Sequence, residues 1–229
     1  KGVYSDLNGI ISREEAKSLF SNNAYGKDSG GDPDAISSLK YDDFVEFHNK
    51  YYDPSNAYFF VYGNFDITKT LEKLDKNYLS RFKKLQVNSD IKQEPRRNSP
   101  IKRTIPYPLS KNEESEKKAA VTINFLTNNL TDTISSLSMS VLENYMLDNA
   151  SSPLRKALID SKLGEALTSS GYADYQRDTF FSVGLKGTEQ KHTDKIIELV
   201  LNTCREVIKN GMNKDRLESS FHKIEFNAQ

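Results

Sequence analysis

Three histidines, His48, His192 and His222, are the side chains of this sequence best suited to binding a metal ion. A zinc hydrolase needs neutral imidazoles and a carboxylate that converge on the metal, usually with two ligands three or four residues apart on one helix. No two of the three histidines are close in sequence. His48 is expected on the surface of an amphipathic helix, His192 at a helix start and His222 near the chain end. We therefore predict no metal ligand in this chain.

Candidate nucleophiles and paired carboxylates are also isolated. Cys204, the single cysteine, lies among apolar residues at helical spacing, and the neighbouring Arg205 should point to another side of the helix. The sequence has no Gly-x-Ser-x-Gly elbow. The pairs Asp42-Asp43 and Glu14-Glu15 are adjacent, so their side chains fall on different helix faces, where we expect them to be solvated. We predict no catalytic residue.

Glycine-rich stretches offer a third kind of site, a phosphate-binding loop. No Lys-Ser or Lys-Thr directly follows Gly30-Gly31-Asp32-Pro33, and Asp32 would repel a phosphate. We expect a tight turn with unusual backbone angles instead, in which Asp32 caps the next segment of the chain. Gly184 and Gly187 are expected to permit close packing near a strand end. Substrate-binding residues stay unknown from the sequence.

Composition and charge are those of a soluble globular chain. The 229 residues suffice for one large or two ordinary domains, and we expect two. The 32 Lys and Arg residues balance 32 Asp and Glu residues, so there is no global field to collect nucleic acid or anionic membrane. No apolar run approaches the ~18 residues of a membrane span. We expect neither nucleic acid nor a membrane as partner. A single cysteine fits a reducing compartment.

The first third of the sequence predicts a helix, a strand and a second helix. Apolar residues recur at helical spacing between about Ser38 and Tyr52, and the helix ends before Pro54. The aromatic run at 57–62 is typical of a strand covered on both faces. Asp66 or Thr68 caps the next helix. From residue 83 to 118 prolines accumulate and periodicity fades, which indicates a linker, and the charge run at 111–118 is read as a solvated turn.

The remainder predicts a strand at 119–126, then a helix capped by Asp132 and a short helix opened by Ser151-Ser152-Pro153. Two strands, 165–175 and 178–186, come next. The second strand alternates Phe181, Val183 and Leu185 on one face.

A long helix over about 191–209 is expected after these strands, and it stops at Gly211. Asn213 caps the last helix. The inward residues of the long helix are expected to be Ile196, Ile197, Val200, Cys204, Val207 and Ile208. This order of elements predicts an α+β fold rather than a repeating parallel unit.

An ordered series of short motifs runs through nearly the whole chain. The motifs are Lys1-Gly2-Val3-Tyr4-Ser5-Asp6, Leu19-Phe20, Asn23-Ala24-Tyr25-Gly26-Lys27-Asp28-Ser29-Gly30-Gly31-Asp32-Pro33, Phe44-x-x-Phe47-His48-x-Lys50-Tyr51-Tyr52-x-Pro54-Ser55-Asn56, Tyr62-Gly63-Asn64, Ser151-Ser152-Pro153-Leu154-Arg155-Lys156-Ala157-Leu158, Phe181-Ser182-Val183-Gly184-Leu185-Lys186-Gly187 and Ile224-Glu225-Phe226. In this order they resemble the presequence-protease branch of the pitrilysin (insulinase) family of zinc metallopeptidases.

The resemblance implies a large peptidase of two homologous halves around a chamber, built from α+β domains whose mixed or antiparallel sheets pack against helices. Such enzymes cleave short unstructured peptides. Their zinc is held by an inverted His-x-x-Glu-His helix and a later Glu, and the Glu of the helix acts as base toward a zinc-bound water. This sequence has neither motif. No catalytic or metal-binding residue of the family can be carried over, and Lys1 would stand directly after the last zinc ligand.

Under this resemblance the chain is an interior fragment, with a true N-terminus further upstream. Residues 1–85 would be the C-terminal part of the catalytic domain, 86–117 a linker and 118–229 an incomplete second, non-catalytic homologous domain. Zinc would belong to the full-length parent, and we expect none in this segment, which would be inactive alone. Expected partners are peptide substrates and the remaining domains of the same polypeptide. Arg155 could face the chamber. The expected location is the bacterial cytoplasm or an organelle matrix.

Two other functions remain open on the sequence alone. The parent could be a catalytically dead homologue that captures or positions peptides. Alternatively, the chain could be a purely structural α+β module whose likeness to the peptidases is one of fold alone. Sequence upstream of Lys1 separates the first of these from an active enzyme, because a dead homologue would keep the fold but lose a His or the Glu.

Overall fold

The computed structural model describes residues 6–110, 112 and 115–228, so that the motif at 1–5 and part of the charge run lie outside the described residues. The chain divides into two compact units. The sheet unit comprises residues 1–27 and 93–229, and the inserted unit comprises residues 28–92. Among the described helices, none is long and apolar enough to cross a membrane.

The sheet unit is built on an antiparallel sheet with β4 (Asp178–Thr188) at its centre. On one side β4 pairs with β1 (Ala119–Asn129), and on the other it pairs with β2 (Ala166–Leu167) and β3 (Gly171–Ala173). The prediction of a single strand over 165–175 is therefore wrong, because the structure has two short strands there, separated by residues 168–170. The Ser170 hydroxyl bonds back to the Thr168 carbonyl, and Gly171 takes a φ of +140°, which together interrupt the run.

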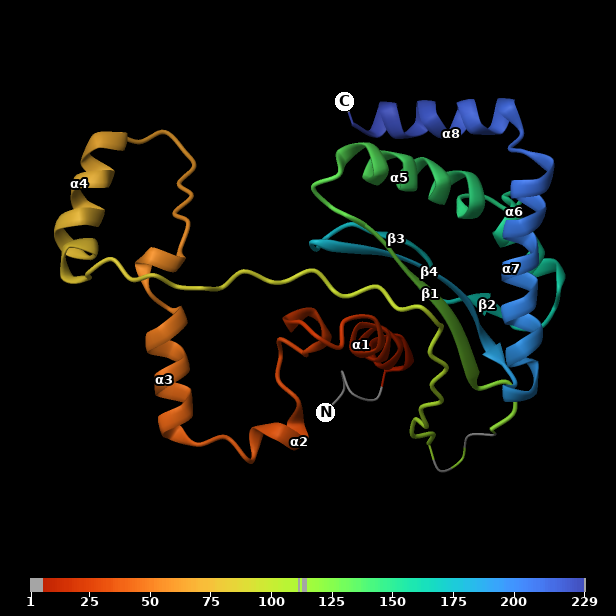
Figure 1. The fold of residues 1–229 in the computed structure, drawn as a ribbon, viewed down its shortest axis with the longest axis horizontal. Coiled ribbons are helices and arrows are strands. Elements are labelled where there is room, and N and C mark those ends of the chain that lie inside the picture. Colours follow the sequence, from red (N-terminus) through yellow and green to blue (C-terminus); the bar gives the residue numbers. More distant parts are fainter. Residues whose placement is uncertain (1–5, 111, 113–114, 229) are drawn as a thin grey trace. The chain divides into compact units, whose positions relative to one another are not determined.

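Four helices lie on one side of this sheet in Figure 1. They are α5 (Thr133–Leu147), α6 (Pro153–Asp160), α7 (Thr193–Asn210) and α8 (Lys214–Asn227). Asp132 caps α5 and Asn213 caps α8, each by accepting a backbone N–H three residues on, as predicted. The caps and the helix boundaries confirm the α+β order expected from the sequence.

The main core of the sheet unit forms between the sheet and these helices. The alternation of β4 is confirmed, because Phe181, Val183 and Leu185 all point into this core. Its other buried members are Val121, Tyr145, Met146, Leu147, Leu154, Leu158, Ile196 and Val200. Ile208 was expected to face inward but is 82% exposed. It sits in the last turn of α7, where the inward stripe ends with Val207.

The opposite face of the sheet is covered by α1 (Leu7–Leu19) and the short 3-10 helix η2 (Ala24–Gly26). Leu19, Phe20 and Phe180 are buried together there, and Tyr25 packs edge-on against Phe20 with ring centroids 5.6 Å apart. Successive residues of β4 thus serve different layers, since Phe180 faces α1 and Phe181 faces the main core. The sheet is a middle layer between helices.

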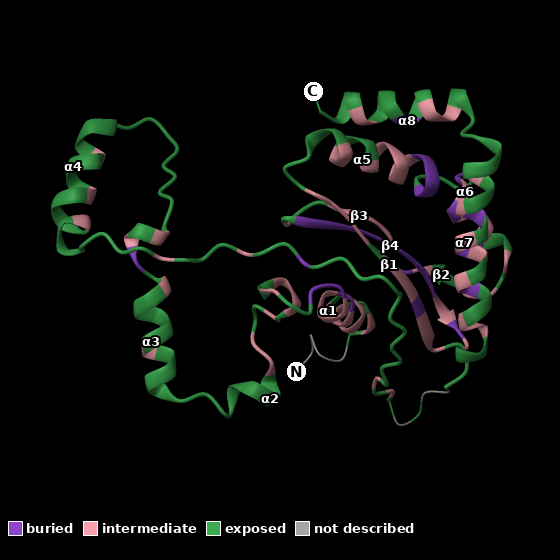
Figure 2. Cartoon of the chain, viewed as in Figure 1, coloured by how far each residue is buried: buried purple, intermediate pink, exposed green. Residues whose placement is uncertain are grey.

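The inserted unit contains helices but almost no buried surface. Its elements are α2 (Pro33–Ile36), α3 (Tyr41–Tyr51), η3 (Pro54–Asn56), α4 (Ile67–Asn77) and η4 (Leu79–Arg81). The predicted helix near 38–52 and the cap at Asp66 are confirmed. Among its described residues only Asp53 is buried, and Figure 2 shows the unit almost entirely in the colour of exposed residues.

The strand predicted at 57–62 is absent from the structure, which has no regular element there. Strands form only where a neighbouring strand completes their hydrogen bonds. Within the described chain no strand lies beside this run to do so. The correction therefore concerns the pairing of the segment, which belongs to neither a helix nor a strand in the structure.

The chain re-enters the sheet unit at Gln93, inside the stretch predicted as a linker. Glu94 is 2% exposed, and its carboxylate accepts hydrogen bonds from Ser21 and Asn22. Its own N–H donates to the Asp178 carboxylate over 2.8 Å. The stretch has no helix or strand among its described residues, yet it is anchored at this point. The domain limits 1–85, 86–117 and 118–229 remain a prediction.

Candidate functional site

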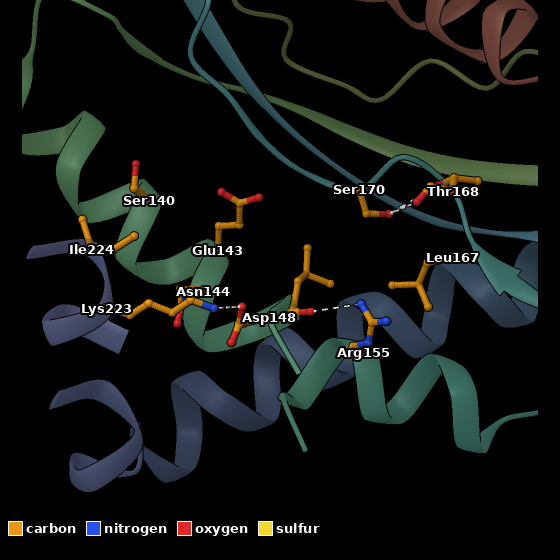
Figure 3. Close-up of a pocket in the computed structure, with 11 residues that line it drawn as sticks. Ser140, Glu143, Asn144, Asp148, Arg155, Leu167, Thr168, Ser170, Lys223 and Ile224 are labelled. Carbon is orange, nitrogen blue, oxygen red and sulfur yellow. Dashed lines mark hydrogen bonds and ion pairs between the residues drawn. The ribbon is translucent and has the colours of Figure 1, made fainter. Parts of the chain in front are cut away.

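A polar pocket of about 340 Å³ opens in the sheet unit beside α5 (Figure 3). Such a volume is at the lower end of those that hold small ligands. The lining residues are Ser140, Glu143, Asn144, Leu147, Asp148, Arg155, Leu167, Thr168, Ser170, Lys223 and Ile224. Charged and hydroxyl-bearing side chains dominate this lining, so the pocket suits a polar ligand.

Four separate elements position the lining. The second half of α5 carries Ser140 and Glu143 at a spacing of three residues, which places them on one helix face. Asp148 stands at the C-cap of α5. Arg155 comes from α6 and Lys223 from α8. The connection between β2 and β3 closes the other side with Thr168 and Ser170, as Figure 3 shows.

The pKa of the Glu143 carboxyl is raised from its ordinary value. Burial raises the pKa of its carboxyl, Asp174 and Asp148 raise it further, and a hydrogen bond from the Tyr172 backbone N–H opposes the rise. The carboxylate lies directly over Gly171, where a Cβ would fall 2.0 Å from Oε1. A glycine is required there both for this approach and for its φ of +140°.

The two cations of the pocket differ in their partners. Lys223 forms an ion pair with Asp148 at the pocket rim. Arg155 has no carboxylate partner among the described residues, and its Nη1 lies 3.5 Å from the Leu147 carbonyl, at the limit of a hydrogen bond. The guanidinium can therefore still donate to a ligand. The pocket thus combines a carboxylate and a guanidinium that are not paired with each other.

The hydroxyl groups of the pocket are not set up as nucleophiles. Ser140 Oγ donates to the Ser136 carbonyl over 3.1 Å, and Ser170 Oγ donates to the Thr168 carbonyl over 3.1 Å. A catalytic hydroxyl needs a hydrogen bond to a general base instead. With these partners the pocket can bind and orient a ligand through hydrogen bonds. Its geometry does not favour covalent chemistry.

A second polar cluster lies under α1 and corrects one expectation. Glu15 was predicted to be solvated but is buried against the sheet, where Ser182 Oγ donates to Oε1 over 3.1 Å. Burial raises the pKa of Glu15, while hydrogen bonds from Ser182, Thr122 and Asn124 oppose the rise. No local pattern indicates this burial, since only the packing of α1 on the sheet removes Glu15 from water. Asp42 and Asp43 are exposed as expected.

None of the three histidines, nor the cysteine, is among the residues that line the pocket in the described structure. His48 is exposed and stacks on Tyr52 with ring centroids 5.0 Å apart, and His222 lies 3.3 Å from Glu225 on α8. His192 ends η5 (Gln190–His192), and its Nδ1 is buried without a hydrogen-bond partner in the described structure. Burial raises the pKa of the Cys204 thiol, which favours the unreactive protonated form.

The donor set can be tested against the requirements of zinc. A zinc site needs three or four His, Cys, Asp or Glu side chains converging on one point. Within residues 6–110, 112 and 115–228 no group of three such residues could hold a metal ion. The described residues therefore do not fit a resident zinc. A metal implied by the resemblance would need ligands from elsewhere in the polypeptide.

The glycine and turn motifs have structural roles. Gly31 has a φ of +86°, and Asp32 accepts the Asp34 N–H at the start of α2, as expected. A Cβ on Gly184 would lie 2.0 Å from the Val121 carbonyl oxygen, and one on Gly187 would lie 2.7 Å from Glu165 Cβ. Close packing at both glycines is thereby confirmed.

Arg155 is the one pocket residue that the sequence singled out. Glu143, Asp148 and Lys223 were missed, because they come from separate elements and match no motif. One sequence signal was available: polar residues recur on α5 every three to four positions, which indicates a hydrophilic face on that helix.

Comparison with known proteins places the chain in a family. Residues 38–222 match the family model described as the peptidase M16 inactive domain. Over 226 residues the chain is 34% identical to the protein HypA of Clostridium perfringens. It is 36% identical to presequence protease 1, chloroplastic/mitochondrial, of Arabidopsis thaliana over 232 residues, and 36% identical to the mitochondrial presequence protease of Mus musculus over 231 residues.

These alignments cover 99% to 100% of this chain but only 21% to 23% of each relative. The chain thus spans less than a quarter of the length of the curated relatives it matches.

Solved structures agree in fold. The peptidase M16 inactive domain from Pseudomonas fluorescens is 16% identical with a TM-score of 0.66, and the alignment covers 98% of this chain and 52% of that one. A protease from Helicobacter pylori is 20% identical with a TM-score of 0.58, covering 96% and 52%. By the family model, which matches most of its length, this chain belongs to the peptidase M16 inactive-domain family.

Proposed function

We propose that this chain is the non-catalytic segment of a zinc-dependent metalloendopeptidase that degrades short unstructured peptides. One observation carries the proposal: relatives named presequence proteases align with this chain over its full length at 36% identity. The zinc ligands and the general base belong to residues outside this chain. The segment alone has neither zinc nor peptidase activity, and its partners are peptides and the remaining domains of its own polypeptide.

The pocket beside α5 is the part of the described chain best suited to contacting a peptide. A peptide backbone presents amide donors and carbonyl acceptors, and its termini carry one charge of each sign. Arg155 can donate to a carbonyl or carboxylate, and Glu143 can accept from an amide or ammonium group. We therefore assign the pocket a role in binding and orienting peptide, with no part in bond cleavage.

The location also belongs to this proposal. Relatives of the chain are named as mitochondrial or chloroplastic proteins or come from a bacterium. We place the parent in a bacterial cytoplasm or an organelle matrix. The single cysteine fits such reducing surroundings.

Activity of the full-length parent tests the proposed function. An unstructured fluorogenic peptide is incubated with the parent, with and without a metal chelator, and then with zinc restored. We expect cleavage that the chelator abolishes and zinc restores. Chelator-insensitive cleavage would contradict a zinc peptidase. Peptide binding without cleavage would instead identify the parent as a catalytically dead, peptide-binding homologue.

Substitutions in the pocket test its role separately. In the full-length parent, Arg155→Gln and Glu143→Gln should each raise KM by about 10- to 100-fold with kcat unchanged, since a charge-assisted hydrogen bond contributes about 1.5–3 kcal/mol. The matched control is Lys156→Gln, which removes a charge on α6 that pairs with Asp160 in solvent. Unchanged KM in both pocket variants would remove the pocket from the proposal while leaving the peptidase assignment intact.

A further inference from the structure

The pocket beside α5 offers its ligand several hydrogen-bond acceptors. A serine hydroxyl has a single hydrogen to donate. Ser140 Oγ donates it to the Ser136 carbonyl, and Ser170 Oγ donates it to the Thr168 carbonyl. Each hydroxyl can therefore offer the pocket only its lone pairs. Glu143 adds a carboxylate, which accepts hydrogen bonds and donates none when it is ionised. A ligand that contacts these three side chains must supply the donors.

The charge around Glu143 is negative. Burial raises the pKa of the Glu143 carboxyl, and the charges of Asp174 and Asp148 raise it further. Lys223, a cation of the lining, is already paired with Asp148. Like charges close together disfavour ionisation, and a cation placed among them favours it. An ammonium group combines hydrogen-bond donors with the positive charge that this part of the pocket lacks.

Arg155 supplies the opposite charge. Its Nη1 lies 3.5 Å from the Leu147 carbonyl, at the limit of a hydrogen bond, and it has no carboxylate partner among the described residues. Leu147 follows Glu143 by one helical turn, about 6 Å along the axis of α5. The guanidinium and the Glu143 carboxylate thus border one pocket about a turn apart (Figure 3). A ligand that meets both needs an ammonium and a carboxylate close together, as in an α-amino acid.

The remaining lining and the size of the pocket narrow the ligand further. Leu147, Leu167 and Ile224 contribute apolar side chains, which suit an aliphatic group of a ligand. The volume of about 340 Å³ is near the lower limit of sites that hold small ligands. This size favours a single amino acid over a longer peptide.

We propose that the pocket beside α5 binds a free α-amino acid with an aliphatic side chain, its ammonium group on Glu143 and its carboxylate on Arg155. The inference goes beyond the proposed function, because it requires neither that the ligand be cleaved nor that the parent be a peptidase. A bound amino acid would exclude peptide from the pocket, so the two ligands would compete for it.

Isothermal titration calorimetry of the full-length parent tests the site with L-leucine and two capped forms of it. N-acetyl-L-leucine lacks the ammonium group, and L-leucinamide lacks the carboxylate. We expect leucine to bind, and each capped form to bind about tenfold or more weakly, since each loses a charge-assisted hydrogen bond. Absence of leucine binding, or equal affinity for leucine and a capped form, would overturn the proposal. Neither result would affect the peptidase assignment, which is tested by cleavage.

Substitutions assign each end of the ligand to its residue. Glu143→Gln should weaken the binding of leucine and leucinamide about tenfold or more and leave that of N-acetyl-leucine unchanged, because only the first two carry an ammonium group. Arg155→Gln should weaken the binding of leucine and N-acetyl-leucine and leave that of leucinamide unchanged. Lys156→Gln is the matched control, since Lys156 pairs with Asp160 in solvent, and it should bind all three probes as the wild type does.

Two outcomes of the substitutions would overturn the proposed orientation. One is a Glu143→Gln or Arg155→Gln parent that binds leucine as Lys156→Gln does. The other is an equal loss of affinity for all three probes in a variant whose Tm shows that it is folded. If a substitution prevents folding, the comparison of leucine with its capped forms in the wild type still decides, because it needs no variant.

Discussion

The sheet unit and the inserted unit both contain aromatic and aliphatic residues, but a core of these side chains is buried in the sheet unit, whereas those described in the inserted unit are exposed or only partly buried. In the sheet unit a continuous core of buried side chains forms between β1, β4 and the helices α5, α6 and α7. In the inserted unit the described aromatic and aliphatic side chains remain in contact with solvent, and only Asp53 is buried. Apolar composition alone therefore does not make a core, because each face needs a second face to pack against.

The contrast also bears on where the proposed peptide binding would be located. The strands of the sheet unit pair with one another, and this unit carries the polar pocket beside α5. The inserted unit lacks strand partners within the described chain. We expect the first to remain folded in isolation and the second to depend on the rest of the polypeptide. This asymmetry can be tested on the isolated segment.

Core truncation should have the largest effect. Leu158 is 0% exposed in the main core, so Leu158→Ala should lower the free energy of unfolding by about 2–5 kcal/mol. Leu71→Ala is the counterpart in the inserted unit, where the side chain is 60% exposed, and we expect a change within about 0.5 kcal/mol. Urea denaturation monitored by circular dichroism measures both. Equal losses would show that the inserted unit has a core of its own.

Overpacking at Gly184 should cause the second-largest loss in the free energy of unfolding. An added methyl would meet the Val121 carbonyl oxygen at 2.0 Å, so Gly184→Ala should cost about 1–3 kcal/mol through forced separation of β1 and β4. Gly30→Ala in the inserted unit would meet only the Asp28 side chain, at 3.3 Å. Thermal unfolding compares the two variants. A neutral Gly184→Ala would mean that the two strands are less tightly paired than the structure shows.

Asp178 fixes the stretch of chain that re-enters the sheet unit after the inserted unit. Asp178 is 0% exposed and accepts hydrogen bonds from the Glu94 N–H and from Arg96. Asp178→Asn should lower the free energy of unfolding by about 1–3 kcal/mol, because a buried donor loses a charged acceptor.

Asp194→Asn is the matched control, since its ion pair with Lys102 is solvated and should contribute about 1 kcal/mol or less. Limited proteolysis with mass spectrometry locates the cleavage sites. If Asp178→Asn does not make the chain easier to cleave near residues 93–97, Asp178 does not anchor this stretch.

The smallest effect should be a pH dependence from Glu15. Burial raises its folded-state pKa above the ordinary value of 4.5. Its contribution to stability is then fully present below pH 4.5 and is lost as pH rises through the folded-state pKa. The free energy of unfolding of the wild type should therefore fall relative to that of Glu15→Gln as the pH rises above 4.5. Parallel profiles would place Glu15 in solvent and α1 off the sheet.

Local patterns in the sequence determined much of this protein. Asp66, Asp132 and Asn213 cap helices because a side-chain oxygen reaches a backbone N–H only two or three residues away. The alternation in β4 has a period of two residues, and it indicated the core face correctly. The ordered motifs indicated the family, which the comparison then confirmed. Each of these signals lies within a few residues along the chain, so no tertiary contact was needed to read them.

Only the tertiary structure decided which polar groups are buried and which strands are paired. Glu15 meets Ser182 across 167 positions, and Glu94 meets Asp178 across 84. The pocket joins residues of α5, α6, α8 and the β2–β3 connection. The run 57–62 has the composition of a strand but no strand beside it within the described chain. Burial and pairing depend on partners distant in sequence, and a local pattern carries no information about whether those partners are present.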